Sequence, residues 1–261
     1  MTAKKDNSVQ LLRSLMENPG EALVIHYSRQ NLNDNEQGMA TPRIIAIMVK
    51  SMDGIVTNCF AIHHEAEKVR VIRESIADYY DLLESRLLIS FNNFVKRNPG
   101  RKWIHWDMND VHFSFEAIQH RYEVLVDESG EGFVQVPNKD RVNLNQLLKV
   151  IYSSNYEIEP QLDNLMRTNS GGNLKNYFLT LPEEAQAFKQ LAFPAILESL
   201  RIKVNFLLEV VERAANETLK VGKRNRINRL KAFITHPLTA TVSLFLTLAS
   251  LVLKVLGLLG K

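Results

Sequence analysis

The chain has 261 residues, 45% of them hydrophobic and 23% charged, which is typical of a folded protein and argues against a disordered one. Its single cysteine, Cys59, excludes an intrachain disulfide and a cysteine-based metal cluster. The net charge of +3 is uneven: residues 220–231 carry six basic and no acidic side chains, so the other residues sum to −3 and do not predict general nucleic-acid binding. Residues 1–18 lack the apolar run of a signal peptide, so we expect the soluble part in a reducing compartment.

The first part of the chain predicts a short helix followed by an antiparallel meander. The helix spans Ser8–Glu17 and ends at Asn18-Pro19-Gly20. The strand candidates are Ala22–Tyr27, Arg43–Lys50 and Ile55–Ile62, with an Asp-Gly turn between the last two. Residues 65–94 are predicted to form two helices that bury Leu82, Leu83, Leu87, Leu88, Phe91 and Phe94.

The second part alternates between strand and helix patterns, which predicts parallel strands added to the meander. The strand candidates are Lys102–His105 and Gly132–Val136. The helix candidates are Asp110–Val124, Val142–Tyr152, Pro160–Met166 and Pro182–Leu219, the last broken at Phe193-Pro194. The chain is therefore expected to be an α/β protein with a mixed sheet and a helical C-terminal region.

The segment from Leu87 to Arg121, LLISFNNFVKRNPGRKWIHWDMNDVHFSFEAIQHR, carries the most specific motif. It resembles the second motif of the DEDD family of 3′–5′ exonucleases, in which a Leu- and Phe-rich helix leads to a strand ending in His-Asn and then to a metal-binding Asp. In this chain His105 matches the motif's His, Trp106 replaces its Asn, and Asp110 matches its Asp. The resemblance covers roughly residues 20–215 and implies a ribonuclease H-like fold, whose element order the predicted elements share.

The resemblance also implies a reaction that this sequence is poorly equipped to catalyse. Such exonucleases hold two divalent cations with four carboxylates. The family's first pair lies on the first strand, but Val24–Arg29 contains no carboxylate and ends in a cation. On the last helix the best candidate position holds Asn205. Only Asp110 matches, and an acidic helix cap is an alternative explanation for it. We therefore expect the enzymatic activity to be lost and no cofactor to be bound.

Three weaker site hypotheses remain open. A rearranged Mg²⁺-dependent nuclease site would be built from Asp107, Asp110, Asp140 and Glu198. A His/Asp site would combine His26, His105 and His112 with Asp107 and Asp110 if the first and fourth strands are neighbours. The run His63-His64-Glu65 contains metal-binding residue types. Adjacent histidines on a strand point to opposite faces, however, and cannot easily bind one ion together. Trp103 and Trp106 favour core packing over base stacking.

The C-terminal end predicts a membrane anchor. Residues 237–260 contain one charge, Lys254, and are about as long as a bilayer-spanning helix requires. The preceding basic residues would contact anionic head groups and keep the N-terminal domain in the cytoplasm. These basic residues are Lys220, Lys223, Arg224, Arg226, Arg229 and Lys231. A buried core helix and an interfacial helix are the alternatives.

Small and polar residues of this tail recur at helical spacing on one face. The stripe consists of Ser243, Thr247, Ser250, Lys254 and Gly257. Small residues let membrane helices approach closely, so the stripe favours homo-oligomerisation, although Ser and Thr can also align by chance.

The predicted organisation is an N-terminal helix (1–20), an exonuclease-like domain (21–219), a basic segment (220–232) and a transmembrane tail (233–261). It favours a single-pass membrane protein whose degenerate domain binds a nucleic acid or protein partner and passes that event to the tail. By analogy of architecture alone, it is similar to bacterial effectors that perturb membranes in anti-phage defence. An active nuclease and a structural tail-anchored adaptor are the alternatives.

Overall fold

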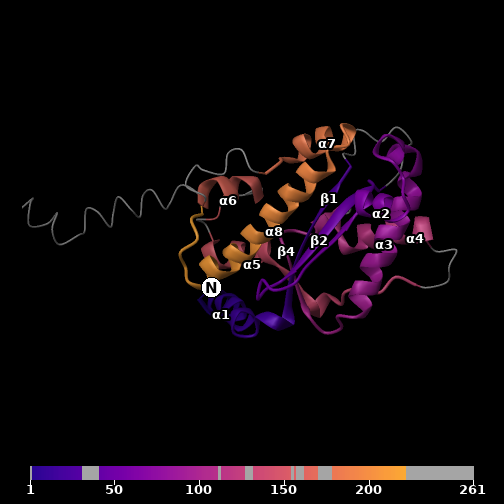
Figure 1. Ribbon diagram of the computed structural model, residues 1–261. Coiled ribbons are helices and arrows are strands. Elements are labelled where there is room, and N and C mark those ends of the chain that lie inside the picture. The colour runs from indigo at the N-terminus through magenta and orange to yellow at the C-terminus, as the bar shows by residue number, and fades with distance from the viewer. Residues whose placement is uncertain are drawn as a thin grey trace, which may run out of the picture.

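The centre of the protein is a mixed five-stranded sheet (Figure 1). The computed structural model describes residues 2–30, 41–110, 113–126, 132–153, 156, 162–169 and 178–221. The strands lie in the order β3-β2-β1-β4-β7. Their bounds are β1 (Ala22–Arg29), β2 (Ile44–Ser51), β3 (Thr57–Ala61), β4 (Lys102–His105) and β7 (Arg141–Asn143). Neighbouring strands are antiparallel among β1, β2 and β3 and parallel among β1, β4 and β7, which confirms the predicted α/β class and mixed sheet.

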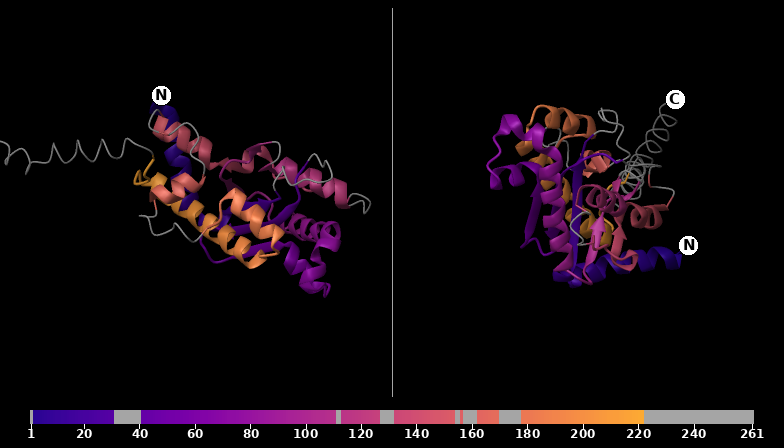
Figure 2. Two further views of the ribbon diagram at one scale, coloured as in Figure 1. Left: turned by 90° about the horizontal axis from the view of Figure 1, so that it is seen from above. Right: turned by 90° about the vertical axis from the view of Figure 1, so that its right-hand side faces the viewer.

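Helices cover both faces of the sheet. On one face, α1, α5 and α8 enclose one hydrophobic cluster, and on the other, α2, α3 and α4 enclose a second (Figures 1 and 2). The helices are α1 (Thr2–Glu17), α2 (Ile62–Lys68), α3 (Tyr80–Lys96), α4 (Phe115–Val126), α5 (Leu144–Tyr152), α6 (Leu162–Asn169), α7 (Leu181–Lys189) and α8 (Phe193–Ala215). The break between α7 and α8 occurs where the sequence predicts it, with Leu191 at a φ of 53° and Pro194 in the first turn of α8.

Strand β1 is buried on both faces because it lies in the middle of the sheet. Ala22 and Val24 pack toward α1 and α8, while Leu23, Ile25 and Tyr27 pack toward α3 and α4. This explains the continuous apolar run at its start. At its end the pairing with β2 shifts by one residue between Ser28 and Arg29. Such bulges bend a sheet and often lie beside functional sites.

The helix predicted for residues 110–124 begins later than expected. A short hairpin, β5 (Asn109–Asp110) and β6 (Phe113–Ser114), comes first, and α4 starts at Phe115. The hydroxyl of Ser114 accepts a hydrogen bond from the backbone N–H of Ala117 at 3.0 Å, which is how an N-terminal cap acts. Ser114 therefore caps this helix, and the interpretation of Asp110 as its cap is wrong.

The fifth strand is also displaced from its prediction, because it is formed by β7 and not by Gly132–Val136. In the predicted segment the amide of Asn92 binds both the N–H of Val134, at 2.8 Å, and the carbonyl of Gly132, at 3.3 Å. A side chain of α3 thus satisfies backbone groups that a strand would have paired. Leu82 is a second correction, since it is half exposed whereas its predicted core neighbours on α3 are buried.

Among the described residues, no helix is long and apolar enough to cross a membrane. The predicted tail (233–261) and its polar stripe lie outside the described residues, as do all basic residues of the preceding segment except Lys220. The described chain ends at Val221, and the amide of Asn169 holds the backbone of Lys220 through two hydrogen bonds of 3.0 Å. Leu219 and Val221 are buried in the core cluster under α1, α5 and α8.

A candidate binding pocket at the end of strand β1

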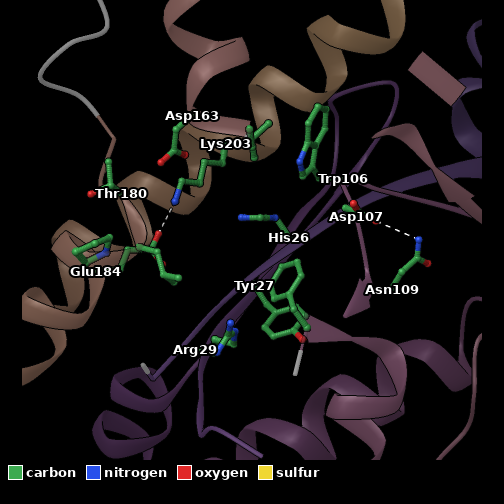
Figure 3. Close-up of a pocket in the computed structure, with 14 residues that line it drawn as sticks. His26, Tyr27, Arg29, Trp106, Asp107, Asn109, Asp163, Thr180, Glu184 and Lys203 are labelled. Carbon is green, nitrogen blue, oxygen red and sulfur yellow. Dashed lines mark hydrogen bonds and ion pairs between the residues drawn. The ribbon is translucent and has the colours of Figure 1, made fainter. Parts of the chain in front are cut away.

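A pocket of about 960 Å³ opens at the carboxyl ends of β1 and β4 (Figure 3). His26, Tyr27 and Arg29 reach it from β1, and Trp106 and Asp107 follow β4 directly. Lys203 of α8 and residues of α6 and α7 form the opposite wall. In α/β sheets, ligands bind in crevices outside the carboxyl ends of the strands, so this is where the fold favours a site. The volume lies within the range of small-molecule pockets.

A buried ion pair forms one side of the pocket. The ammonium of Lys203 donates to Glu184 Oε1 at 2.7 Å, and both side chains are almost fully buried. Glu184 also accepts hydrogen bonds from Ser28 of β1, at 2.8 Å, and Ser199 of α8, at 3.3 Å. A buried charge requires such partners to offset its lost hydration. The pair therefore ties α7, α8 and β1 together at this wall.

The other side of the pocket carries a carboxylate surrounded by neutral amides. Asp107 accepts hydrogen bonds from the side chains of Asn109 (3.1 Å), Asn143 (3.0 Å) and Asn145 (2.7 Å). Asn145 in turn accepts from the hydroxyl of Tyr156 at 2.8 Å. Burial and, secondarily, the charge of Asp107 raise the pKa of Tyr156. Three donors fix Asp107 in place, so both of its oxygens are already engaged.

Three titratable side chains that line the pocket have no hydrogen-bond or ion-pair partner within the described part of the chain: His26, Arg29 and Asp163. Burial, followed by the nearby charge of Lys203, lowers the pKa of His26 to about 3, so its imidazole is neutral at physiological pH. Burial raises the pKa of Asp163, and the charge of Lys203 opposes this shift. These three titratable groups are available to a ligand.

Aromatic rings complete the lining. Tyr27 and Phe113 stack with ring centroids 4.3 Å apart, and His26 meets the same Phe113 ring edge-on at 5.6 Å. Trp106 is 7% exposed and belongs to the core cluster, while its indole edge borders the pocket (Figure 3). Its packing role is therefore as predicted, and it contributes to the pocket as well. Flat apolar walls with a few polar groups are typical of ligand sites.

The carboxylates of the rearranged nuclease hypothesis do not gather here. Asp140 immediately precedes β7 and pairs with Lys102, the first residue of β4, at 2.8 Å, so it lies at the amino ends of these strands, away from the pocket at their carboxyl ends. Glu198 pairs with Arg201 on the exposed side of α8. Asp107 lines the pocket but is held by amides. Asp110 lies in β5, and its side chain is outside the described part of the structure.

The His/Asp hypothesis is wrong for His105, the histidine that matches the exonuclease motif. Its side chain is buried, and its Nδ1 accepts a hydrogen bond from the backbone N–H of Met108 at 3.1 Å. Burial lowers the pKa of His105 to about 4. It does not line the pocket that His26 enters, although β1 and β4 are neighbours as expected. His112 lies outside the described residues.

No group of three or more His, Cys, Asp or Glu side chains suited to a metal ion occurs in the described ranges, and this includes His63, His64 and Glu65. On α8, Asn205 is directed away from the site and accepts a hydrogen bond from Lys50 of β2 at 2.7 Å. Lys203 reaches the pocket instead. Its spacing of three from Leu200 and four from Leu207, both buried, is the signal that marks it as a buried cation.

Sequence reasoning missed Asp163 and Glu184, because neither belongs to a motif. Glu184 lies in the first turn of α7, which begins with a capping box formed by Thr180 and Glu183. Comparison of the chain with protein-family models, with curated proteins and with solved structures finds no match.

Proposed function

We propose that this chain is a membrane-tethered binding module whose pocket at the end of β1 receives the end of a nucleic-acid strand without cleaving it. One observation carries the proposal. The pocket lies at the carboxyl ends of β1 and β4, and β1 and α8 contribute His26, Arg29 and Lys203 to it where the exonuclease motif would require carboxylates.

The sheet supports the comparison on which this proposal depends. Three antiparallel strands followed by two parallel strands, in the order β3-β2-β1-β4-β7, agree with a ribonuclease H-like arrangement. In that arrangement the site lies beside the first strand. The resemblance of residues 87–121 to the exonuclease motif therefore suggests a strand end as the ligand.

The chemistry of the pocket favours binding over hydrolysis. Two-metal hydrolysis needs several unengaged carboxylates around a common point. Of the three acids that line the pocket, Glu184 is paired with Lys203 and Asp107 already accepts hydrogen bonds from three amides. Arg29 supplies a cation for a phosphate, while the ring of Phe113 and the indole edge of Trp106 supply apolar surface against which a base can pack. The result is a site for holding a strand end.

The C-terminal tail supplies the second half of the proposal. Residues 237–260 are long and apolar enough to span a bilayer, and the basic segment before them suits anionic lipids. We propose that strand binding in the domain is passed to this tail, whose polar stripe brings copies together in the membrane. Such an arrangement suits an effector that acts on the membrane, as in bacterial defence.

The test uses the full chain in lipid nanodiscs and a short single-stranded oligonucleotide labelled at its 5′ end. Binding is followed by fluorescence anisotropy, and strand length by denaturing electrophoresis, with Mg²⁺ or Mn²⁺ present in both assays. We expect saturable binding with no shortening of the strand. Metal-dependent shortening would establish a nuclease instead, and absence of binding would refute the module.

A further inference from the structure

We propose that the pocket distinguishes ribose from deoxyribose at the strand end, with Asp163 accepting hydrogen bonds from the 2′- and 3′-hydroxyls of the terminal sugar. This inference rests on the proposed function, because it names the sugar that the same pocket holds. It makes Asp163 a specificity-determining residue.

Of the three acids that line the pocket, one has no hydrogen-bond donor among the described residues. Glu184 uses one oxygen for Lys203 and Ser199 and the other for Ser28. Asp107 uses both oxygens for amides. Among the pocket acids whose contacts the structure describes, Asp163 alone has no hydrogen bond. A partly buried carboxylate without donors is costly, so a ligand that supplies donors gains from meeting it.

The charged side chains are unevenly distributed around the pocket. Asp163 lies on the side of the pocket that also holds Glu184 and Lys203, whereas Arg29 lies at the far side with His26 between them (Figure 3). Two acids against one cation make the Asp163 side unfavourable for a phosphate. Arg29, which has no carboxylate partner among the described residues, is favourable for one.

A ligand complementary to this arrangement is anionic at one end and carries neutral O–H donors at the other. The terminal nucleotide of an RNA strand fits this description, because its 5′ phosphate can meet Arg29 while its two free hydroxyls can meet Asp163. A carboxylate has two oxygens and accepts such a pair directly. The 2′-hydroxyl is also the group by which proteins distinguish RNA from DNA.

The neutral imidazole of His26 suits the middle of such a ligand. It lies between the two charged ends and offers one donor and one acceptor without adding charge. A cationic side chain at this position would attract a phosphate toward Asp163. An anionic side chain would repel a phosphate from Arg29.

The experiment compares oligoribonucleotides that differ only in their last sugar, which is ribose in one strand and 2′-deoxyribose in the other. The full chain in zwitterionic nanodiscs is titrated against each strand by anisotropy. We expect the ribose-ended strand to bind about tenfold more tightly, the scale of one hydrogen bond to a charged group. Asp163→Ala should abolish this preference, while Glu209→Gln, at an exposed acid of α8, should preserve it.

The outcomes separate this inference from the function beneath it. Equal affinity for the two strands, or a ribose preference that survives Asp163→Ala, would overturn the assignment of Asp163 and leave the binding module intact. Absence of binding by either strand would overturn the proposed function and the sugar assignment together. A near-ultraviolet circular dichroism spectrum of each variant confirms that it is folded, which is expected because Asp163 makes no structural hydrogen bond within the described residues.

Discussion

Lys203 Nζ lies 2.7 Å from Glu184 Oε1, and their side chains are only 6% and 4% exposed. Because Glu184 also binds Ser28 of β1, this pair connects α7 and α8 to the central strand beside the pocket. A buried pair of this kind contributes little net stability compared with an apolar pair, but breaking it leaves one charge without compensation.

Lys203→Met should therefore destabilise the protein by about 3–5 kcal/mol, because the Glu184 carboxylate would remain buried without its counter-ion. The free energy of unfolding, measured by urea titration, checks this. Combining Lys203→Met with Glu184→Leu should recover much of the loss. A double variant whose destabilisation equals or exceeds the sum of the two single effects would contradict the account.

Arg29→Ala should leave stability within about 0.5 kcal/mol of the parent protein, because Arg29 has no partner among the described residues. The same change should weaken strand binding and lower the slope of log affinity against log salt by about one unit, as expected for a lost phosphate contact. Lys149→Ala, at an exposed position of α5, is the matched control. An unchanged salt slope in Arg29→Ala would place the phosphate elsewhere.

The sequence predicts the strands that position this pocket, and it singles out His26 and Asp107, which line it. It does not predict the other charged side chains of the pocket walls, for physical reasons. The apolar run of β1 and the Asp-Gly turn report local structure directly, so the meander was predicted correctly. Glu184 pairs with Lys203, and Asp163 lies near that pair, only because α6, α7 and α8 pack together, and no local sequence pattern encodes this packing. The fifth strand is likewise misplaced by a contact that is distant in sequence. The side chain of Asn92 forms hydrogen bonds with the backbone N–H of Val134 and the carbonyl of Gly132, which a strand would have paired.

The neutral state of His26 predicts a pH dependence of stability. Its pKa in the folded protein is about 3, below the ordinary value of 6.5. Below pH 6.5 the unfolded chain therefore binds a proton that the folded protein does not, so stability falls as the pH is lowered from 6.5 toward 3. The contribution of His26 to this slope approaches about 1.4 kcal/mol per pH unit between these values, and it fades as the pH rises through 6.5.

His26→Gln should remove that contribution, so that between pH 7 and pH 5 the variant loses about 2 kcal/mol less stability than the parent protein. Urea titrations at the two pH values measure the difference. His120→Gln, at an exposed position of α4, serves as the control and should retain the parental slope. Equal slopes for His26→Gln and the parent protein would show that the pKa of His26 is the same in the folded and unfolded states.

The proposed anchor predicts a difference between the full chain and a version ending at Val221. This end point keeps Leu219 and Val221, which are buried in the core. The full chain should stay with membranes after a carbonate wash and slow growth when expressed, whereas the shortened chain should be soluble and harmless. Release of the full chain by salt alone would indicate surface association through the basic segment.

Photo-crosslinking tests the central claim most directly, because it locates the strand end on the protein. An RNA strand with 4-thiouridine as its last nucleotide is bound to the full chain in nanodiscs, irradiated, and the linked peptides are identified by mass spectrometry. The account predicts crosslinks to the pocket, at Tyr27, Trp106 or Phe113, and their loss with excess unlabelled strand. Crosslinks confined to residues 220–231 would contradict it, because they would show that the basic segment holds the strand and the pocket does not.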